Sequence, residues 1–171
     1  MEIGATKAVQ DRLKTTKIEE SKGASLVFCW DTHLTKIKGR NVLFIVNASN
    51  RYTIAMTDIE PRNWNYYAMY IIRVIHGMMQ EMGYSEEQIE QYFKMSGDTT
   101  ITKTHGRKSV GGINRMVMDA QYFGKKLEKE AKYQWELSEY LNRDICQPEG
   151  FDAYGYPSEL FKLDMERLGI A

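Results

Sequence analysis

Residues 42–46 read Val42-Leu43-Phe44-Ile45-Val46, an uninterrupted apolar run of strand length. A strand that faces water on one side alternates apolar and polar residues, and this run has no polar position. We therefore predict a central strand that is buried on both faces. Polar, turn-forming residues flank it on both sides, in Lys36–Asn41 and Asn47–Asn50.

Two further strands are predicted beside this run. The residues from Ala24 to Thr35 are rich in β-forming types, and those from Arg51 to Thr57 alternate apolar with polar or small side chains. Three sequential strands joined by short loops predict an antiparallel meander. Short β-like segments at Glu2–Thr6 and Thr99–Thr102 bring the sheet to four or five strands.

Helices are predicted from three- and four-residue apolar spacing at Trp64–Met82, Ser85–Phe93, from near Ser109 to about Asn142, and at Ser158–Leu168, with a modest helix at Lys7–Lys14. Gly83 supplies a stop, and Ser85 with Gln88 forms a capping-box pattern. The terminal helix is expected to bury Leu160, Leu163 and Leu168.

Together these elements predict an α+β fold with a mainly antiparallel sheet of four to five strands and helices packed on one face. We expect an α+β core domain over residues 1–123. Residues 124–171 would form a helical C-terminal extension that packs on the core or projects from it.

Composition bounds the class of protein. The 171 residues hold 23 basic and 23 acidic side chains, and this neutral balance argues against a protein dominated by non-specific phosphate binding. Cys29 and Cys146 are too few for a disulfide framework and do not match a common zinc spacing. The N-terminus lacks a signal-peptide layout, and apolar runs are too short for a membrane span. We expect a cytoplasmic protein with no membrane partner.

Catalytic motifs are not found. The three histidines, His33, His76 and His105, fall in different predicted elements, so a metal site would have to be assembled by the fold. Walker, Rossmann and nucleophile-elbow patterns are absent from the sequence. We therefore predict neither metal nor cofactor, and favour a binding protein over an enzyme.

The most distinctive polar stretch reads Lys103-Thr104-His105-Gly106-Arg107-Lys108-Ser109-Val110-Gly111-Gly112-Ile113-Asn114, with Arg115 next. A basic turn that opens a helix can cradle an anion, because helix N-termini present unpaired N–H groups. The alternative is a solvated loop with Ser109 as N-cap and glycines that allow close packing.

A second polar cluster follows the apolar run. It consists of Asn47, Ser49, Asn50, Arg51 and Tyr52. Its asparagines and serine are either turn formers between two strands, or the cluster places Arg51 and Tyr52 at a strand end beside the basic turn. The candidate binding residues are Lys103, Thr104, Arg107, Lys108, Asn114, Arg115, Asn47, Asn50, Arg51 and Tyr52. An exposed subset of the C-terminal aromatic residues would also indicate a partner surface.

These residues support a non-catalytic binding or regulatory protein that contacts a partner protein or a nucleic-acid backbone. An alternative is a small metal-independent phosphodiesterase or ribonuclease, with His33 or His105 as acid/base and Lys103 and Arg107 stabilising the transition state. A mobile-element inhibitor or a toxin–antitoxin component is a third possibility. Oligomeric state stays open.

The order of these pieces resembles an uncharacterised family of small prokaryotic domains, known as a domain of unknown function. The resemblance rests on Thr6-Lys7, Trp30, Val46-Asn47, and a signature K-T-x-x-R-x-x-V-G-x-[IM]-N matched by Lys103, Thr104, Arg107, Val110, Gly111, Ile113 and Asn114. It covers roughly residues 1–123. The resemblance implies where the core domain ends, and it implies no activity.

Overall fold

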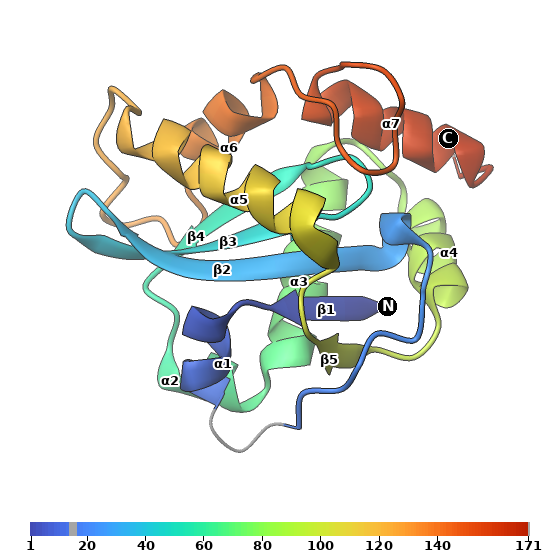
Figure 1. Ribbon diagram of the computed structural model, residues 1–171, viewed down its shortest axis with the longest axis horizontal. Coiled ribbons are helices and arrows are strands. Elements are labelled where there is room, and N and C mark those ends of the chain that lie inside the picture. The colour runs from blue at the N-terminus through green and yellow to red at the C-terminus, as the bar shows by residue number, and fades with distance from the viewer. Residues whose placement is uncertain (14–16, 171) are drawn as a thin grey trace.

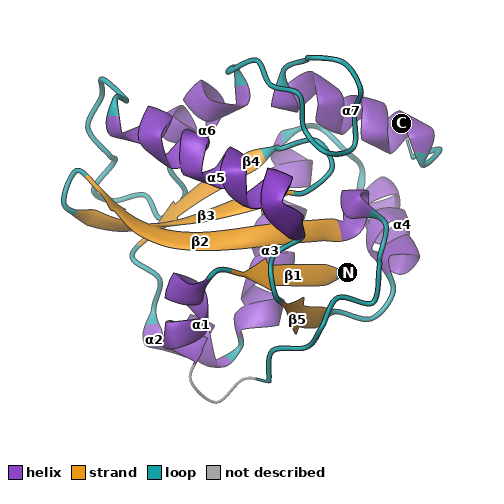
Figure 2. Ribbon diagram, viewed as in Figure 1, coloured by secondary structure: helices purple, strands orange, loops and turns teal. Residues whose placement is uncertain are grey.

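The computed structural model describes residues 1–13 and 17–170 and shows a five-stranded sheet flanked by helices (Figure 1). The strands are β1 (Glu2–Ala5), β2 (Cys29–Ile37), β3 (Arg40–Asn47), β4 (Thr53–Thr57) and β5 (Thr100–Thr102). The helices are α1 (Lys7–Leu13), α2 (Pro61–Asn65), α3 (Tyr67–Glu81), α4 (Glu86–Ser96), α5 (Gly106–Gln121), α6 (Trp135–Asn142) and α7 (Pro157–Arg167). The α+β class is confirmed (Figure 2).

The sheet is mixed, with strand order β4-β3-β2-β1-β5. The predicted meander is confirmed, because β2, β3 and β4 pair antiparallel in sequence order. These antiparallel ladders are the longer ones. The short strand β1 inserts between β2 and β5 and runs parallel to both, which the sequence analysis did not anticipate.

Both faces of β3 are buried, as its apolar run predicts. Leu43 and Ile45 belong to one core cluster and Val42, Phe44 and Val46 to the other, in keeping with the two-residue period of a strand. The first cluster takes side chains from α1, α3, α4 and α7, and the second from α5 and α6. Helices therefore lie on both sides of the sheet (Figure 1), and the expectation that they pack on one face is wrong.

The long helix predicted to run from near Ser109 to about Asn142 is two helices. α5 begins earlier, at Gly106, and ends at Gln121, and α6 begins only at Trp135. The segment between them runs to the edge of β4, where the Thr57 and Gln134 amides donate to the Lys132 and Ala55 carbonyls at 2.7 and 2.9 Å. These backbone hydrogen bonds to a strand edge take the place of a helical continuation.

The predicted capping box and glycine stop at the ends of helices are confirmed. The capping box at Ser85 and Gln88 opens α4, and Gly83 follows α3 with a positive φ of 88°. α1 ends at Leu13, and the expected end at Lys14 lies outside the described residues. Within the part of the chain that the structure describes, no helix has the length and apolar character to cross a bilayer.

The C-terminal segment contributes to the same core as the N-terminal part. The Phe161 ring lies 6.2 Å from the ring of Trp30 and 5.3 Å from that of Tyr52, measured between centroids. Phe161 and Met165 are fully buried, whereas Leu163, expected on the apolar face of α7, is 43% exposed. The division of the chain at residue 123 stays a prediction.

Substitutions on α7 measure how much this segment stabilises the fold. We expect Phe161→Ala to lower the free energy of unfolding by about 3–5 kcal/mol, because it opens a cavity between buried rings. Leu163→Ala on the same helix should change it by less than about 0.5 kcal/mol, because the side chain is exposed. Denaturant unfolding of both variants gives the values, and equal small effects would show that α7 is not part of the cooperative core.

Candidate functional site

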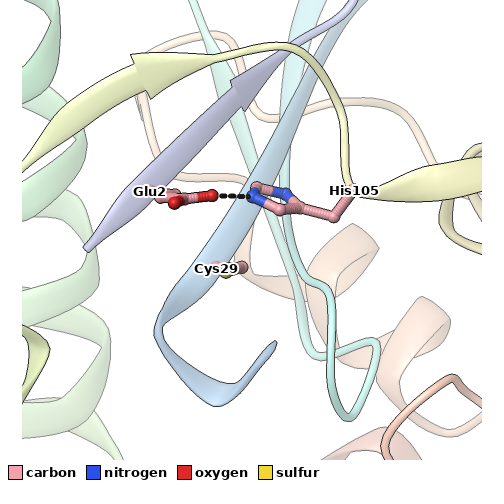
Figure 3. A group of neighbouring side chains, drawn as sticks. All are labelled: Glu2, Cys29 and His105. Atoms are coloured by element: carbon pink, nitrogen blue, oxygen red, sulfur yellow. Dashed lines mark hydrogen bonds and ion pairs between the residues drawn. The ribbon is translucent and has the colours of Figure 1, made fainter. Parts of the chain in front are cut away.

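A buried polar cluster joins the sheet to the turn before α5. The His105 ring lies between two carboxylates, with Nδ1 2.7 Å from Asp31 Oδ1 and Nε2 3.0 Å from Glu2 Oε2. The side chain of His105 is 5% exposed, and those of Glu2 and Asp31 are 4% and 0% exposed. Cys29 lies beside the Glu2–His105 pair (Figure 3).

The strand register explains why these groups meet. Glu2 pairs with Cys29, and Gly4 pairs with Asp31, on adjacent parallel strands, so all four residues share one face of the sheet. That is the face covered by α5. The turn after β5 then carries His105 over this face, and its backbone N–H donates to both Asp31 oxygens at 3.2 Å.

Further hydrogen bonds hold both carboxylates. The Ser109 hydroxyl, one turn into α5, donates to Asp31 Oδ2. Glu2 accepts from the Ser21 hydroxyl and from the Lys22 amide, each at 2.7 Å. Ser109 is therefore not the N-cap of the helix, as one sequence interpretation had it, because α5 has already begun at Gly106.

Gly4 makes room for the cluster. A Cβ at this position would lie 1.8 Å from Asp31 Oδ1 and 3.1 Å from His105 Nδ1. The carboxylate is short, fully buried and hydrogen-bonded, so it has little freedom to move aside. A side chain at position 4 is thus incompatible with the observed geometry.

Electrostatics in the cluster favour a charged imidazole. Burial by itself lowers the pKa of His105, but hydrogen bonding to Asp31 and the neighbouring Cys29 sulfur outweigh it and raise the pKa to about 10. Burial pushes the pKa of Glu2 upward, and hydrogen bonds from Ser21, Lys22 and His105 bring it below its usual value. Even with a protonated His105 ring, the two carboxylates of Glu2 and Asp31 face a single cation, so the cluster keeps a net negative charge.

Both ring nitrogens of His105 face carboxylates, and its side chain is 5% exposed. His33, the other histidine of the ribonuclease hypothesis, places Nδ1 3.2 Å from the Thr6 hydroxyl, and burial lowers its pKa. The two histidines extend from different elements and are not in mutual hydrogen-bond contact. The cluster can hold a cation, since Glu2, Cys29 and His105 offer three donor atoms within 4.8 Å of one another.

The predicted basic turn is largely exposed and partly neutralised. Lys103 forms an ion pair with Glu20, and the ammonium of Lys108 lies 3.2 Å from the Pro148 carbonyl and 4.0 Å from Glu149. Arg115 faces Asp119 at 3.9 Å. Within residues 1–13 and 17–170, Arg107 has no ion-pair partner, and Asn114 is also exposed on α5, whereas Thr104 is half-buried.

Arg51 lies beside this turn, as one sequence interpretation proposed. It has a positive φ of 67°, and its guanidinium packs over Gly112, where a Cβ would come within 2.6 Å of Nε. The side chain lines a hollow of about 50 Å³ together with Lys108, Ser109 and the 147–149 segment. It also lines a second hollow of about 20 Å³ with Arg115 and Cys146.

The other members of the second polar cluster have structural contacts. Asn47 donates to the Val27 carbonyl at 2.9 Å and accepts from the amides of Ser49 and Asn50. Asn50 donates to Asp164 at 2.9 Å, which ties the β3–β4 loop to α7. Tyr52 is 6% exposed and packs in the core. Asn47 and Asn50 thus have the contacts that the turn-forming interpretation expects, and Tyr52 is a core residue.

Sequence reasoning missed Glu2, Cys29 and Asp31 as members of a site. Their signal is weak, because it consists of single polar residues within apolar strand segments. Asp31 stands between Trp30 and Thr32, and all three are fully buried. An acidic residue in a strand that is buried on both faces needs polar partners, and this was the signal in the sequence that could have indicated a site.

Fold and site define an α+β domain with a buried carboxylate–histidine cluster beneath a basic helix N-terminus. The chain belongs to the family described as Domain of unknown function (DUF6933), whose model matches residues 2–160. The resemblance to an uncharacterised domain family is thereby confirmed, and the match continues past residue 123 through α6 into α7. Neither a curated protein nor a solved structure matches the chain.

The charged ring should stabilise the protein in a pH-dependent way. We expect His105→Gln to lower the free energy of unfolding by about 3 kcal/mol near neutral pH, because it leaves buried carboxylates without their cation. The pKa of His105 rises from 6.5 to about 10 on folding, so this stabilisation is complete below pH 6.5 and disappears as the pH approaches 10.

Urea unfolding of chelator-treated protein at about pH 6 and about pH 9.5 measures the difference between the wild type and the variant. The exposed pair His76–Glu86, with nitrogen and oxygen 3.0 Å apart, offers a matched control. His76→Gln should cost less than about 1 kcal/mol. A difference for His105→Gln that grows with pH would contradict a protonated ring.

Proposed function

We propose that the chain is a non-catalytic binding protein that contacts a protein partner through the outward side of α5. The observation that carries this proposal is a stripe of exposed residues along the helix, which we call the α5 face: Arg107, Gly111, Asn114, Arg115, Met118 and Tyr122. These positions recur at three- and four-residue steps, so they share one side of the helix. Met118 is 63% exposed and Tyr122 is 80% exposed.

The residue types on the α5 face support a protein partner over a nucleic-acid backbone. Arginine, methionine and tyrosine are enriched at protein–protein interfaces, and tyrosine and arginine dominate their binding energy. Tyr140 of α6 is 43% exposed, and its ring lies 5.4 Å from that of Phe123, the residue after Tyr122. Glu149 lies near Lys108 and Asp119 near Arg115, and these acidic side chains reduce the positive charge that binding of a phosphate backbone requires.

The opposite side of α5 supports a preorganised surface. Ile113, Met116 and Ala120 are buried against the sheet, and Ser109 is bonded to Asp31 at the start of the helix. A helix fixed along its length loses little conformational entropy when a partner binds, which favours affinity. Arg51 and Lys108 flank the first turn and offer cationic groups to an acidic side chain of the partner.

Partner capture from cells that carry the gene, followed by affinity measurement with the purified partner, tests this proposal. We expect Arg107→Glu with Tyr122→Ala to weaken binding at least about 10-fold, because both side chains would be interface anchors. The matched control is Arg73→Glu with Tyr66→Ala. Both are exposed residues associated with α3, which packs on the other face of the sheet, and this pair should leave the affinity unchanged.

A generic single-stranded RNA and a DNA duplex form the second arm of the experiment. Nucleic-acid binding that falls steeply with salt and depends on Arg107 but not on Tyr122 would replace the protein partner with a phosphate backbone. A captured protein whose affinity responds equally to the α5 pair and to the α3 pair would contradict the α5 face as the binding surface.

A further inference from the structure

We propose that Glu2, Cys29 and His105 form a binding site for a transition-metal ion of the zinc type, with Asp31 orienting the histidine ring. The three ligands come from the start of β1, the start of β2 and the turn before α5. Figure 3 shows the Glu2 carboxylate and the His105 ring facing each other, with Cys29 next to them. This site is separate from the α5 face and does not rest on the proposed function.

The distances suit a single ion. Zinc bonds of about 2.0–2.3 Å at tetrahedral angles place neighbouring donor atoms about 3.3–3.7 Å apart. Here Glu2 Oε2 and His105 Nε2 are 3.0 Å apart, and all three donor atoms lie within 4.8 Å of one another. An ion can therefore enter by small side-chain movements, with the His105–Glu2 hydrogen bond as the contact that it replaces.

The surroundings of the ligands resemble those of a metal site. A histidine that binds a metal through one nitrogen usually donates its other N–H to a carboxylate or a carbonyl, which fixes the orientation of the ring. His105 has this arrangement, because Nδ1 is held by Asp31 at 2.7 Å and Asp31 in turn accepts from Ser109. Nε2 is thereby directed toward Glu2, which the Ser21 hydroxyl and the Lys22 amide hold from outside.

The donor set selects the class of ion. One sulfur, one imidazole nitrogen and one carboxylate oxygen suit zinc or cobalt(II), whereas magnesium and calcium need oxygen ligands. Cys29 is 0% exposed, and its thiol donates to the Ala24 and Ser25 carbonyls, at 3.7 and 3.5 Å. These bonds use only the S–H proton, which a thiol loses on binding a metal, so the sulfur lone pairs can bind the ion.

Charge balance also favours a divalent ion. On binding, the Cys29 thiol and His105 Nε2 each release one proton to solvent, and the metal–sulfur and metal–nitrogen bonds form in their place. Two carboxylates and a thiolate then face a dication and a neutral ring. The ion would link β1, β2 and the turn before α5, and a water would complete a four-coordinate shell.

Titration of the chelator-treated full chain with Co²⁺, followed by competition with Zn²⁺, tests the site. We expect one Co²⁺ per chain, a sulfur-to-cobalt charge-transfer band, and displacement of the cobalt by Zn²⁺. Cys29→Ser should abolish the band and weaken binding at least 10-fold. Cys146→Ser is the matched control, because Cys146 is also buried but belongs to a different cluster, and it should keep both. Asp31→Asn should weaken binding by about 10- to 100-fold and retain the band.

Circular dichroism of each metal-free variant shows whether it has folded. X-ray absorption of the zinc-loaded wild type needs no variant and should show one sulfur among nitrogen and oxygen neighbours. A wild-type chain that binds no ion in one-to-one ratio, or a zinc environment without sulfur, would overturn the proposal. Binding by a folded Cys29→Ser variant with wild-type affinity would do the same.

Discussion

The contact between His105 and its two carboxylates is the interaction on which the arrangement of this protein depends. It fixes the turn after β5 to β1 and β2, and so sets where α5 begins. Burying ionisable groups is costly unless each is paired and hydrogen-bonded, and here Glu2 and Asp31 each accept further hydrogen bonds from hydroxyl and amide donors. Gly4 adds a steric condition, because a side chain there would collide with Asp31.

The sheet that carries this cluster is covered on both sides, and the two sides differ in character. The face toward α3 is mainly apolar and includes Trp30, whose indole N–H donates to Tyr92 at 2.9 Å; Thr32 and Asn47 are buried polar residues on it. The face toward α5 is apolar at β3 but has buried polar groups on both sides of that strand. One set is the cluster at β1 and the start of β2, and the other is Thr53 and Thr57 of β4, which bond Asn142 and Gln134. The carboxylate–histidine cluster lies beneath the first turn of α5.

Much of the fold could be predicted from the sequence, because its signals are local. The apolar run Val42–Val46 indicated a strand buried on both faces, and this observation already required helices on both sides. The expectation that helices pack on one face is wrong because a strand buried on both faces needs packing partners on both sides. The extent of α5 could not be predicted, since the segment after Gln121 leaves the helix for backbone bonds to β4 that depend on tertiary structure.

The site was harder to predict for a related reason. Glu2, Asp31 and His105 are separated by 29 and 74 positions, and only the parallel register of β1 on β2 brings the first two together. Parallel pairing between distant segments leaves no local pattern in the sequence. The basic turn, by contrast, is visible as a run of residues, and one of the two interpretations of the second polar cluster placed Arg51 beside it.

The turn from Lys103 to Ser109 has two sides with different roles. His105 and Ser109 point inward and bond the cluster, whereas Arg107 is exposed on the outside. Because His105 directly precedes α5 and Ser109 lies in its first turn, a shift of the cluster would also move that turn and the side chains that it presents. The buried cluster and the α5 face are therefore mechanically connected, although they differ in chemistry. An ion bound between β1, β2 and this turn would stabilise the geometry of the exposed face without contacting it.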